Sequence, residues 1–555
     1  MAEIDKKLQS PDYASPVMKG DFRLKELSIH SPSNDQAQLL DTPSVFVELN
    51  IYEDLFSNVL KGTYTFLDTQ GYAETIPIIG DETLIISYLT PGGEGTQTDV
   101  SSSDLQSQTV SEEVVKQRFK VYDCVEIGMD ERAKIYQLYF VSEEYLYSSK
   151  MKVSKGYKET YSVIVEDILK KINKNMREDL AKHSFIENTA TPQNVIIPNW
   201  EPLQAINFCA SRSLSADIEE QEQTEGQPNQ SPKPLGSLFV FYEKLGTGFF
   251  YESIESMIIK QKNLNQIPLF QYAPKLAGER STNVGFNYSA VDKFDIKSSF
   301  KTLENLNHGM FGSKLIAYDP IRMKYDEIKY DYYQQKENTN EQTNDETGVT
   351  TITEGAENLT DDSFRRFNDF IATDVSKIDN KQNKLISSKS DFLGSNDAEI
   401  KLATTTRSHD SFFNPVKDTA TANTTSNTAK TETSIGVKSD TFKDQHAKPN
   451  NVEDWLLQRQ VQIHEFGSVV VNFTVSGNTA RHVGDLVRFE VPTTIPDDDP
   501  ELNSVNIGHQ LYSGLYLVSK IRHKITRDIY NMDMELIKNS FAKRIPGQET
   551  EEATE

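Results

Sequence analysis

Hydrophobic and polar positions alternate with a period of two near the C-terminal end of the sequence, between residues 461 and 536. The clearest example is 469–475, where valine or phenylalanine occupies every odd position and the even positions are mostly polar. Such alternation is typical of a strand with one buried face, and we expect that strand to span 461–476. The same pattern recurs at 487–491, 515–521 and 530–536. Segments this closely spaced predict a sheet that curls on itself to remove its edges.

A second stretch of alternating positions lies nearer the N-terminus and predicts a first β-barrel domain over 21–154. Strands are expected at 45–52, 63–67, 84–89, 119–125 and 136–141, several of them preceded by glycine turns. Residues 1–20 are polar and interrupted by proline. They predict a loose N-terminal arm.

The period of the hydrophobic pattern changes after Ser154. Ile164, Ile168 and Ile172 recur every four residues and charged residues fill the opposite face, which predicts an amphipathic helix over 161–176 that Thr160 could cap. A second, short helix should begin at Pro202, because proline suits the first turn of a helix. With a hairpin at 238–253, these elements predict a small α+β domain over 155–280.

Strand patterns return at 281–334 and then give way to a long insertion. Residues 335–455 include stretches rich in Glu, Thr and Asn that cannot bury enough apolar surface to order themselves. We expect 281–334 and 456–545 to form a discontinuous second β-barrel domain, and 546–555 to be an acidic tail. The predicted fold is therefore β-rich and multidomain, with two antiparallel β-barrel tube domains, a small α+β domain and a long, poorly structured insertion.

Composition narrows the classes of protein that this sequence can be. Its 555 residues suit about three or four domains of roughly 150 residues each. The net charge of −25 and the pI near 4.9 argue against a protein that grips nucleic acid through phosphates. Cys124 and Cys209 fit no metal motif and are expected to be buried, reduced thiols. The first ten residues have no apolar core and no run approaches a membrane span, so we expect a soluble protein made in a reducing compartment.

Motifs that would carry chemistry are weak in this sequence. The glycines at 92, 93 and 95 lack the Lys and Ser/Thr of a phosphate-binding loop. The histidines at 464, 482, 509 and 523 have no ligand spacing, and Asp497 to Asp499 stand between prolines, so a solvated loop is the better interpretation. The tyrosines at 325, 330, 332 and 333 are better explained by packing on a sheet than by ligand stacking. We expect no catalytic, cofactor-binding or metal-binding residue, no cofactor and no enzyme activity, although a carboxylate pair among the 83 acidic residues stays open.

Several short, glycine-centred segments carry a resemblance to a known family. Leu60-Lys61-Gly62 and the run from Ile76 to Glu82 are similar to the first barrel of the baseplate hub proteins of contractile-tailed phages. The segment 307–319 resembles the helix-to-strand passage of the second barrel in those proteins, and 477–487 and 512–518 resemble its later strands. The segments follow the order of the family and span most of the chain outside the insertion, which departs from the simplest hub pattern.

The resemblance implies a structural role in a virion. Hubs of this kind are trimers that join a sixfold tail tube to a threefold spike, and two similar barrels in each chain would give equivalent positions around such a ring. The implied partners are two further copies of the chain, tail tube subunits, a separate central spike protein, baseplate wedge proteins and a tape-measure protein. An acidic channel wall would repel phosphates and let DNA pass during genome ejection.

The same resemblance implies a location and two absences. The protein would sit in the tail baseplate of the virion, after assembly in the host cytoplasm. It would bind no specific nucleic acid sequence, and it would contact a membrane only indirectly, through the spike.

Two other classes of protein remain open from the sequence. A secretion-system spike shares the hub architecture, but it would be expected to carry a C-terminal β-helix or effector, whereas a short acidic tail follows the last strand here. A tail-associated peptidoglycan hydrolase would lose its activity when a single Glu or Asp is replaced.

Overall fold

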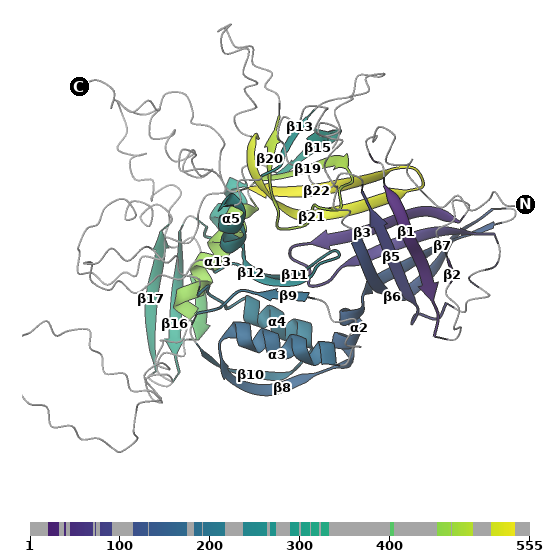
Figure 1. Cartoon of the computed structure of the whole chain (residues 1–555). Helices are drawn as coiled ribbons and strands as arrows, with labels where there is room; N and C mark the ends of the chain where they lie inside the picture. The colour runs from purple at the N-terminus through teal and green to yellow at the C-terminus, as the bar shows by residue number, and fades with distance from the viewer. Residues whose placement is uncertain are drawn as a thin grey trace, which may run out of the picture.

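The computed structural model describes most of the chain outside its long polar stretches (Figure 1). The described residues are 20–32, 38–39, 45–90, 115–174, 183–216, 237–272, 289–331, 400–404, 452–491 and 512–538, with short gaps inside several of these ranges. The expected N-terminal arm before Gly20, nearly all of the insertion at 335–455 and the acidic tail at 546–555 lie outside them.

A fourteen-stranded sheet dominates the molecule and takes strands from both ends of the chain. Its N-terminal half has the order β3-β4-β7-β6-β5-β1-β2, and every neighbouring pair in it is antiparallel. These strands are β1 (Arg23–His30), β2 (Gln38–Leu39), β3 (Phe46–Asp54), β4 (Lys61–Asp68), β5 (Thr83–Leu89), β6 (Val115–Asp130) and β7 (Ala133–Ser142). Strands predicted from alternation between 45 and 141 are therefore present, and β6 is much longer than expected.

The C-terminal half of the sheet has the order β15-β19-β22-β21-β20-β13-β14. Its strands are β13 (Leu269–Tyr272), β14 (Ala290–Val291), β15 (Lys293–Ser298), β19 (Val469–Ser476), β20 (Leu486–Glu490), β21 (Gly514–Thr526) and β22 (Tyr530–Lys538). β15 pairs with β19, which brings together residues from the two sides of 335–455. β21 pairs with β3, and Figure 1 shows the purple N-terminal and yellow C-terminal strands side by side at this seam.

A single hydrophobic core lies against both halves of the sheet. Val471, Phe473 and Val475 are at most 2% exposed, while the residues between them are half-buried. The same core includes buried side chains of β1, β3 and β4, and also Leu238, Tyr242 and Ile258 from the middle of the chain. Burial of alternate side chains from distant segments explains why this sheet forms as one unit.

The middle of the chain forms the α+β unit that the change of period predicted. Helix α3 (Tyr161–Lys174) and helix α4 (Pro202–Ala210) begin where expected, and the Thr160 carbonyl accepts the Ile164 N–H at the start of α3. The remaining elements are α2 (Glu143–Lys150), β8 (Val153–Glu159), β9 (His183–Ile186), β10 (Gln193–Trp200), β11 (Phe239–Lys244), β12 (Gly248–Ser253) and α5 (Ile254–Asn263). A second hydrophobic core joins α2, α3 and α4 to the β8–β10 and β11–β12–β9 sheets, whereas the buried apolar residues of α5 belong to the first core.

Strands β16 (Gly312–Asp319) and β17 (Lys324–Asp331) correct part of the expectation for 281–334. They follow α7 (Thr302–Asn307) but do not join the large sheet, and they form a separate sheet with β18 (Ile400–Thr404), a strand inside the expected insertion. Alternation identifies a strand but not its partner, because pairing depends on long-range contacts that a local pattern does not contain.

The segment at 452–466 is a second correction. Sequence alternation predicts a strand from 461, but 452–466 forms helix α13 (Val452–Phe466), and β19 begins at Val469. The β-rich, multidomain fold class is confirmed. Closure of the sheet into barrels is not detected among the described residues.

Candidate functional site

The seam between β3 and β21 is the candidate site, because it lies at the centre of a long run of strands. Pairing at the seam extends from Asp54 opposite Lys520 to Glu48 opposite Thr526. The run across the seam is β15-β19-β22-β21-β3-β4-β7-β6, and the first part of β6 continues the sheet to β5. One face of this run packs on the core, and the other carries charged side chains around the seam, as expected for antiparallel strands.

Two carboxylates on the face opposite the core, Glu535 and Glu48, each lie between two cations. Glu535 on β22 lies 2.8 Å from Lys297 on β15 and 3.2 Å from Lys520 on β21. Burial alone would raise the pKa of the Glu535 carboxyl, but the two lysines outweigh that effect and lower its pKa. Glu535 thus links three strands of the C-terminal half.

The ladder of charges continues across the seam. Arg522 on β21 lies 3.3 Å from Glu48 on β3 and 3.8 Å from Asp533 on β22. Lys524 lies 3.5 Å from the second oxygen of Glu48, and the Thr474 hydroxyl donates to Asp533 at 2.7 Å. This face therefore mixes both signs of charge, unlike the uniformly acidic wall that the net charge of the chain suggests.

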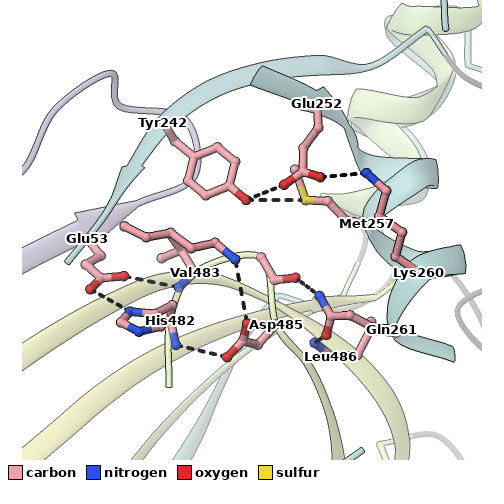
Figure 2. Close-up of polar contacts among 12 residues, drawn as sticks. Glu53, Tyr242, Glu252, Met257, Lys260, Gln261, His482, Val483, Asp485 and Leu486 are labelled. Atoms are coloured by element: carbon pink, nitrogen blue, oxygen red, sulfur yellow. Dashed lines mark hydrogen bonds and ion pairs between the residues drawn. The ribbon is translucent and has the colours of Figure 1, made fainter. Parts of the chain in front are cut away.

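Under the same seam, Glu53 forms a buried polar network on the core side (Figure 2). Its carboxylate accepts the backbone N–H groups of Leu245 and Val483, each at 3.2 Å. The ring nitrogens of His482 and His523 lie 3.3 and 3.2 Å from its Oε1 atom. One side chain of β3 thus contacts the β11–β12 turn, the loop before β20, and β21.

The charge of Glu53 is stabilised by these partners. Burial alone would raise the pKa of the Glu53 carboxyl, but His482 and His523 outweigh it and hold that pKa far below its ordinary value. Burial likewise opposes the charge of His482, but the neighbouring Glu53 carboxylate raises the pKa of that histidine. The pair is therefore a buried ion pair with satisfied hydrogen bonds.

Helix α5 holds the same loop from the other side (Figure 2). The Gln261 side chain donates to the Gly484 carbonyl and accepts the Leu486 N–H, both at 2.5 Å. Tyr242 donates to Glu252 at 2.8 Å, and Lys260 lies 3.4 Å from the same carboxylate. The two Gln261 contacts fix α5 to the loop before β20 of the large sheet, and the Glu252 contacts hold α5 and β11 to β12.

The run of strands ends in edges without a partner strand among the described residues. β6 pairs with β5 only through Val115 to Lys120, so 123–130 have β7 on one side alone. β15 at the opposite end has β19 as its one partner strand in the described chain. The far part of β6 also exposes a row of apolar side chains: Tyr122, Val125, Ile127 and Met129, which are 43–75% exposed.

The candidate residues noted in the sequence lie in different parts of the structure. His482 and His523 meet at Glu53, whereas His464 stacks on His308 with ring centroids 4.7 Å apart. Cys209 is buried and Cys124 half-buried, and both are free thiols. Tyr325 and Tyr330 lie in β17. The remaining candidates lie outside the described residues: Gly92, Gly93, Gly95, Tyr332, Tyr333, Asp497, Asp498, Asp499 and His509.

Glu53 was missed from the sequence, although a signal was present. Leu49 and Ile51 occupy the buried side of β3, and Glu53 continues their alternation. An acidic residue at a buried position of a strand indicates a paired or hydrogen-bonded carboxylate. In the described ranges, His, Cys, Asp and Glu side chains form no group that could hold a metal ion. None of the helices that the structure describes is long and apolar enough to cross a membrane.

Comparison with known proteins gives structural likenesses alone. No protein-family model matches the sequence, and no curated protein matches it. A tail protein from Neisseria meningitidis MC58 is similar at a TM-score of 0.42 and 8% identity, covering 92% of this chain and 96% of that one. The 43 kDa tail protein of prophage MuSo2 from Shewanella oneidensis is similar at a TM-score of 0.41 and 8% identity, covering 92% of this chain and 98% of that one. The E. coli c3393 protein, a component of the type VI secretion system, is similar at a TM-score of 0.33 and 8% identity, covering 95% of this chain and 79% of that one.

Proposed function

We propose that this protein is a structural hub subunit of a phage tail baseplate, and that copies of it form a trimeric ring around an axial channel. The observation that carries the proposal is the run of strands from β15 to β6, in which β15 and residues 123–130 of β6 each leave one side without a partner strand in the described part of the chain. Unpaired strand edges are templates for pairing with another chain. Two different edges on one sheet give a head-to-tail contact, which closes into a ring when the rotation permits.

The two edges also differ in charge. The 123–130 part of β6 carries Asp123, Glu126 and Asp130 and no cation, whereas β15 carries Lys293, Asp295 and Lys297 and is net positive by one charge. Complementary charge favours β6 of one copy beside β15 of the next over contacts between like edges. The exposed side chains of Tyr122, Val125 and Ile127 would be buried in such a contact, which accounts for an apolar row on an otherwise polar strand.

In the proposed assembly, three copies place their two sheet halves alternately around a pseudo-sixfold ring. The ring would adapt a sixfold tail tube to a threefold, separate spike, with wedge proteins outside and DNA or a tape-measure protein in the channel. The role is structural and not enzymatic in this proposal. A secretion-system spike hub is the second candidate, because the ring that it needs would use the same two edges.

Mass measurement of the purified chain tests the ring. We expect trimers and, in electron micrographs, rings with a central hole. The double variant Val125→Lys/Ile127→Lys should shift the population to monomers, since both side chains lie on the β6 edge. Ile196→Lys is a matched control, because Ile196 is 79% exposed on β10, away from both edges. A wild-type chain that stays monomeric at high concentration would rule out the trimer.

A further inference from the structure

The polar face beside the seam holds a row of basic side chains that would otherwise bind phosphates. Lys520, Arg522 and Lys524 alternate along β21, so all three project from one face of the strand. Lys297 on β15 lies on the same face, since it shares Glu535 with Lys520. A row of cations on a regular strand is the kind of surface that holds DNA through its phosphates.

Three carboxylates stand inside this basic row. Glu535 contacts Lys297 and Lys520, Glu48 contacts Arg522 and Lys524, and Asp533 contacts Arg522. Their side chains are only 17%, 30% and 43% exposed, respectively, against 37–49% for the four cations. Glu535 and Glu48 are thus less exposed than all four cations, whereas Asp533 is exposed to about the same extent as they are. All three carboxylates pair with cations on a neighbouring strand.

Side-chain hydrogen bonds fix the acidic members of the ladder in place. Thr474 donates to Asp533 at 2.7 Å, Asn50 donates to Glu48 at 2.8 Å, and Ser519 donates to Glu535 at 3.1 Å. Arg522 is held as well, because its Nε donates to Asn50 at 3.0 Å. An incoming phosphate would have to displace carboxylates that are already positioned, and this lowers the net gain from each contact.

We propose that Glu48, Asp533 and Glu535 mask this basic row, so that double-stranded DNA can pass over the face without being held. The inference rests on the proposed function in one respect, since the ring would turn this face toward its channel. Low adhesion here comes from local pairing of charges and not from an acidic wall. Removal of the three carboxylates should therefore convert the face into a DNA-binding surface.

The test measures binding of a fluorescent 30-base-pair DNA duplex to the full-length chain by anisotropy. Wild type should bind weakly in 50 mM salt. The variant Glu48→Gln/Asp533→Asn/Glu535→Gln should bind at least about tenfold more tightly, and its affinity should fall with salt by about 0.9 log unit per log unit for each phosphate contacted. Carboxamides keep the size of the side chains, and thermal unfolding confirms that the variant is folded.

A matched control separates masking from net charge. Glu166→Gln/Glu201→Gln/Glu304→Gln removes the same number of negative charges, each paired with a lysine elsewhere on the surface. This control should leave DNA binding unchanged within about twofold. Adding Lys520→Gln and Lys524→Gln to the Glu48→Gln/Asp533→Asn/Glu535→Gln variant, the ladder variant, should return its affinity for DNA to that of wild type.

Several outcomes would overturn the inference. Equal gains in the ladder variant and the control would mean that total charge alone decides binding. A folded ladder variant with no gain, or a wild type that already binds as tightly, would refute masking. If the triple variant does not fold, Glu535→Gln alone, which frees two lysines, should still bind about threefold more tightly. Failure of the ring appears instead in the mass measurement, so the two proposals fail separately.

Discussion

Glu53 shows how one residue can tie distant parts of a chain together. Its side chain has no exposed surface and contacts two histidines and two backbone N–H groups from three other segments. Glu53→Gln keeps the shape but removes the charge, and it leaves His482 and His523 without their anion. We expect the free energy of unfolding to fall by about 3 kcal/mol, as when one partner of a buried pair is lost.

Denaturant unfolding of the two proteins measures this loss. Glu166→Gln is a suitable control, because Glu166 forms an exposed pair with Lys170 on α3, and such pairs contribute about 0.5 kcal/mol or less. A Glu53→Gln variant as stable as this control would show that the buried network does not stabilise the seam.

Two glycines in strands offer a second test at the scale of single residues. A Cβ atom on Gly62 of β4 would lie 2.2 Å from the Phe140 ring and 2.4 Å from the Asn50 carbonyl. A Cβ atom on Gly156 of β8 would meet nothing within 4 Å. Gly62→Ala should therefore cost about 1–3 kcal/mol through overpacking, whereas Gly156→Ala should be neutral or slightly stabilising. Thermal unfolding compares them, and equal effects would contradict the close approach of β4 to β7.

At the scale of elements, helix α13 docks on the α+β unit through buried polar side chains. Arg459 donates to the carbonyls of Ala210, Ser237 and Phe239 at 3.0–3.2 Å. Gln462 donates to Glu255 at the start of α5, and burial raises the pKa of the Glu255 carboxyl to about 7. The helix therefore meets a carboxyl that is protonated in mild acid.

This contact predicts a pH dependence. The pKa of Glu255 is raised on folding, so its contribution to stability is present below the unfolded value of 4.5 and is lost as pH rises toward 7. Stability should fall by about 2 kcal/mol between pH 5 and pH 7. His482, whose pKa is also raised, acts in the same direction at the upper end of that window.

Urea unfolding at pH 5 and pH 7 provides the measurement, with Glu255→Gln as the matched variant. The variant should lose most of the slope, because its side chain does not titrate. The pKa of Lys538, lowered by burial to about 7, affects stability mainly above this window. A wild type that is equally stable at both pH values would contradict the protonated state of Glu255.

Helices and strands could be predicted where hydrophobic spacing or a proline within the element itself determines the structure. The spacing of Ile164, Ile168 and Ile172 located α3, and Pro202 located the start of α4. α13 was missed because Val461 and Ile463 also satisfy a period of two, and its buried contacts are made partly by Arg459 and Gln462, which a hydrophobic pattern does not detect. The charged partners at the seam were missed because they come from distant parts of the sequence. Pairing of β3 with β21 joins residues more than 450 positions apart, and a local pattern does not show which strands pair.

At the scale of the whole molecule, the large sheet makes the C-terminal segment dependent on the rest of the chain. β19 needs β15, and β21 needs β3. The core under β19 to β22 also contains side chains from the N-terminal strands and from 238–258. Without these segments, the strands of 456–545 would expose two long edges and a large apolar face.

We therefore expect residues 456–545, expressed alone, to show no cooperative unfolding transition in urea and to aggregate. The full-length chain is the control, and it should unfold cooperatively through this region, as followed by hydrogen exchange of the β21 and β22 amides. Mixing the fragment with residues 1–334 should restore slow exchange in β21, because β3 and β15 then supply the missing edges. A fragment that is a stable, cooperatively unfolding monomer would show that β19 to β22 form a domain of their own, and that the seam is a contact between two independent units.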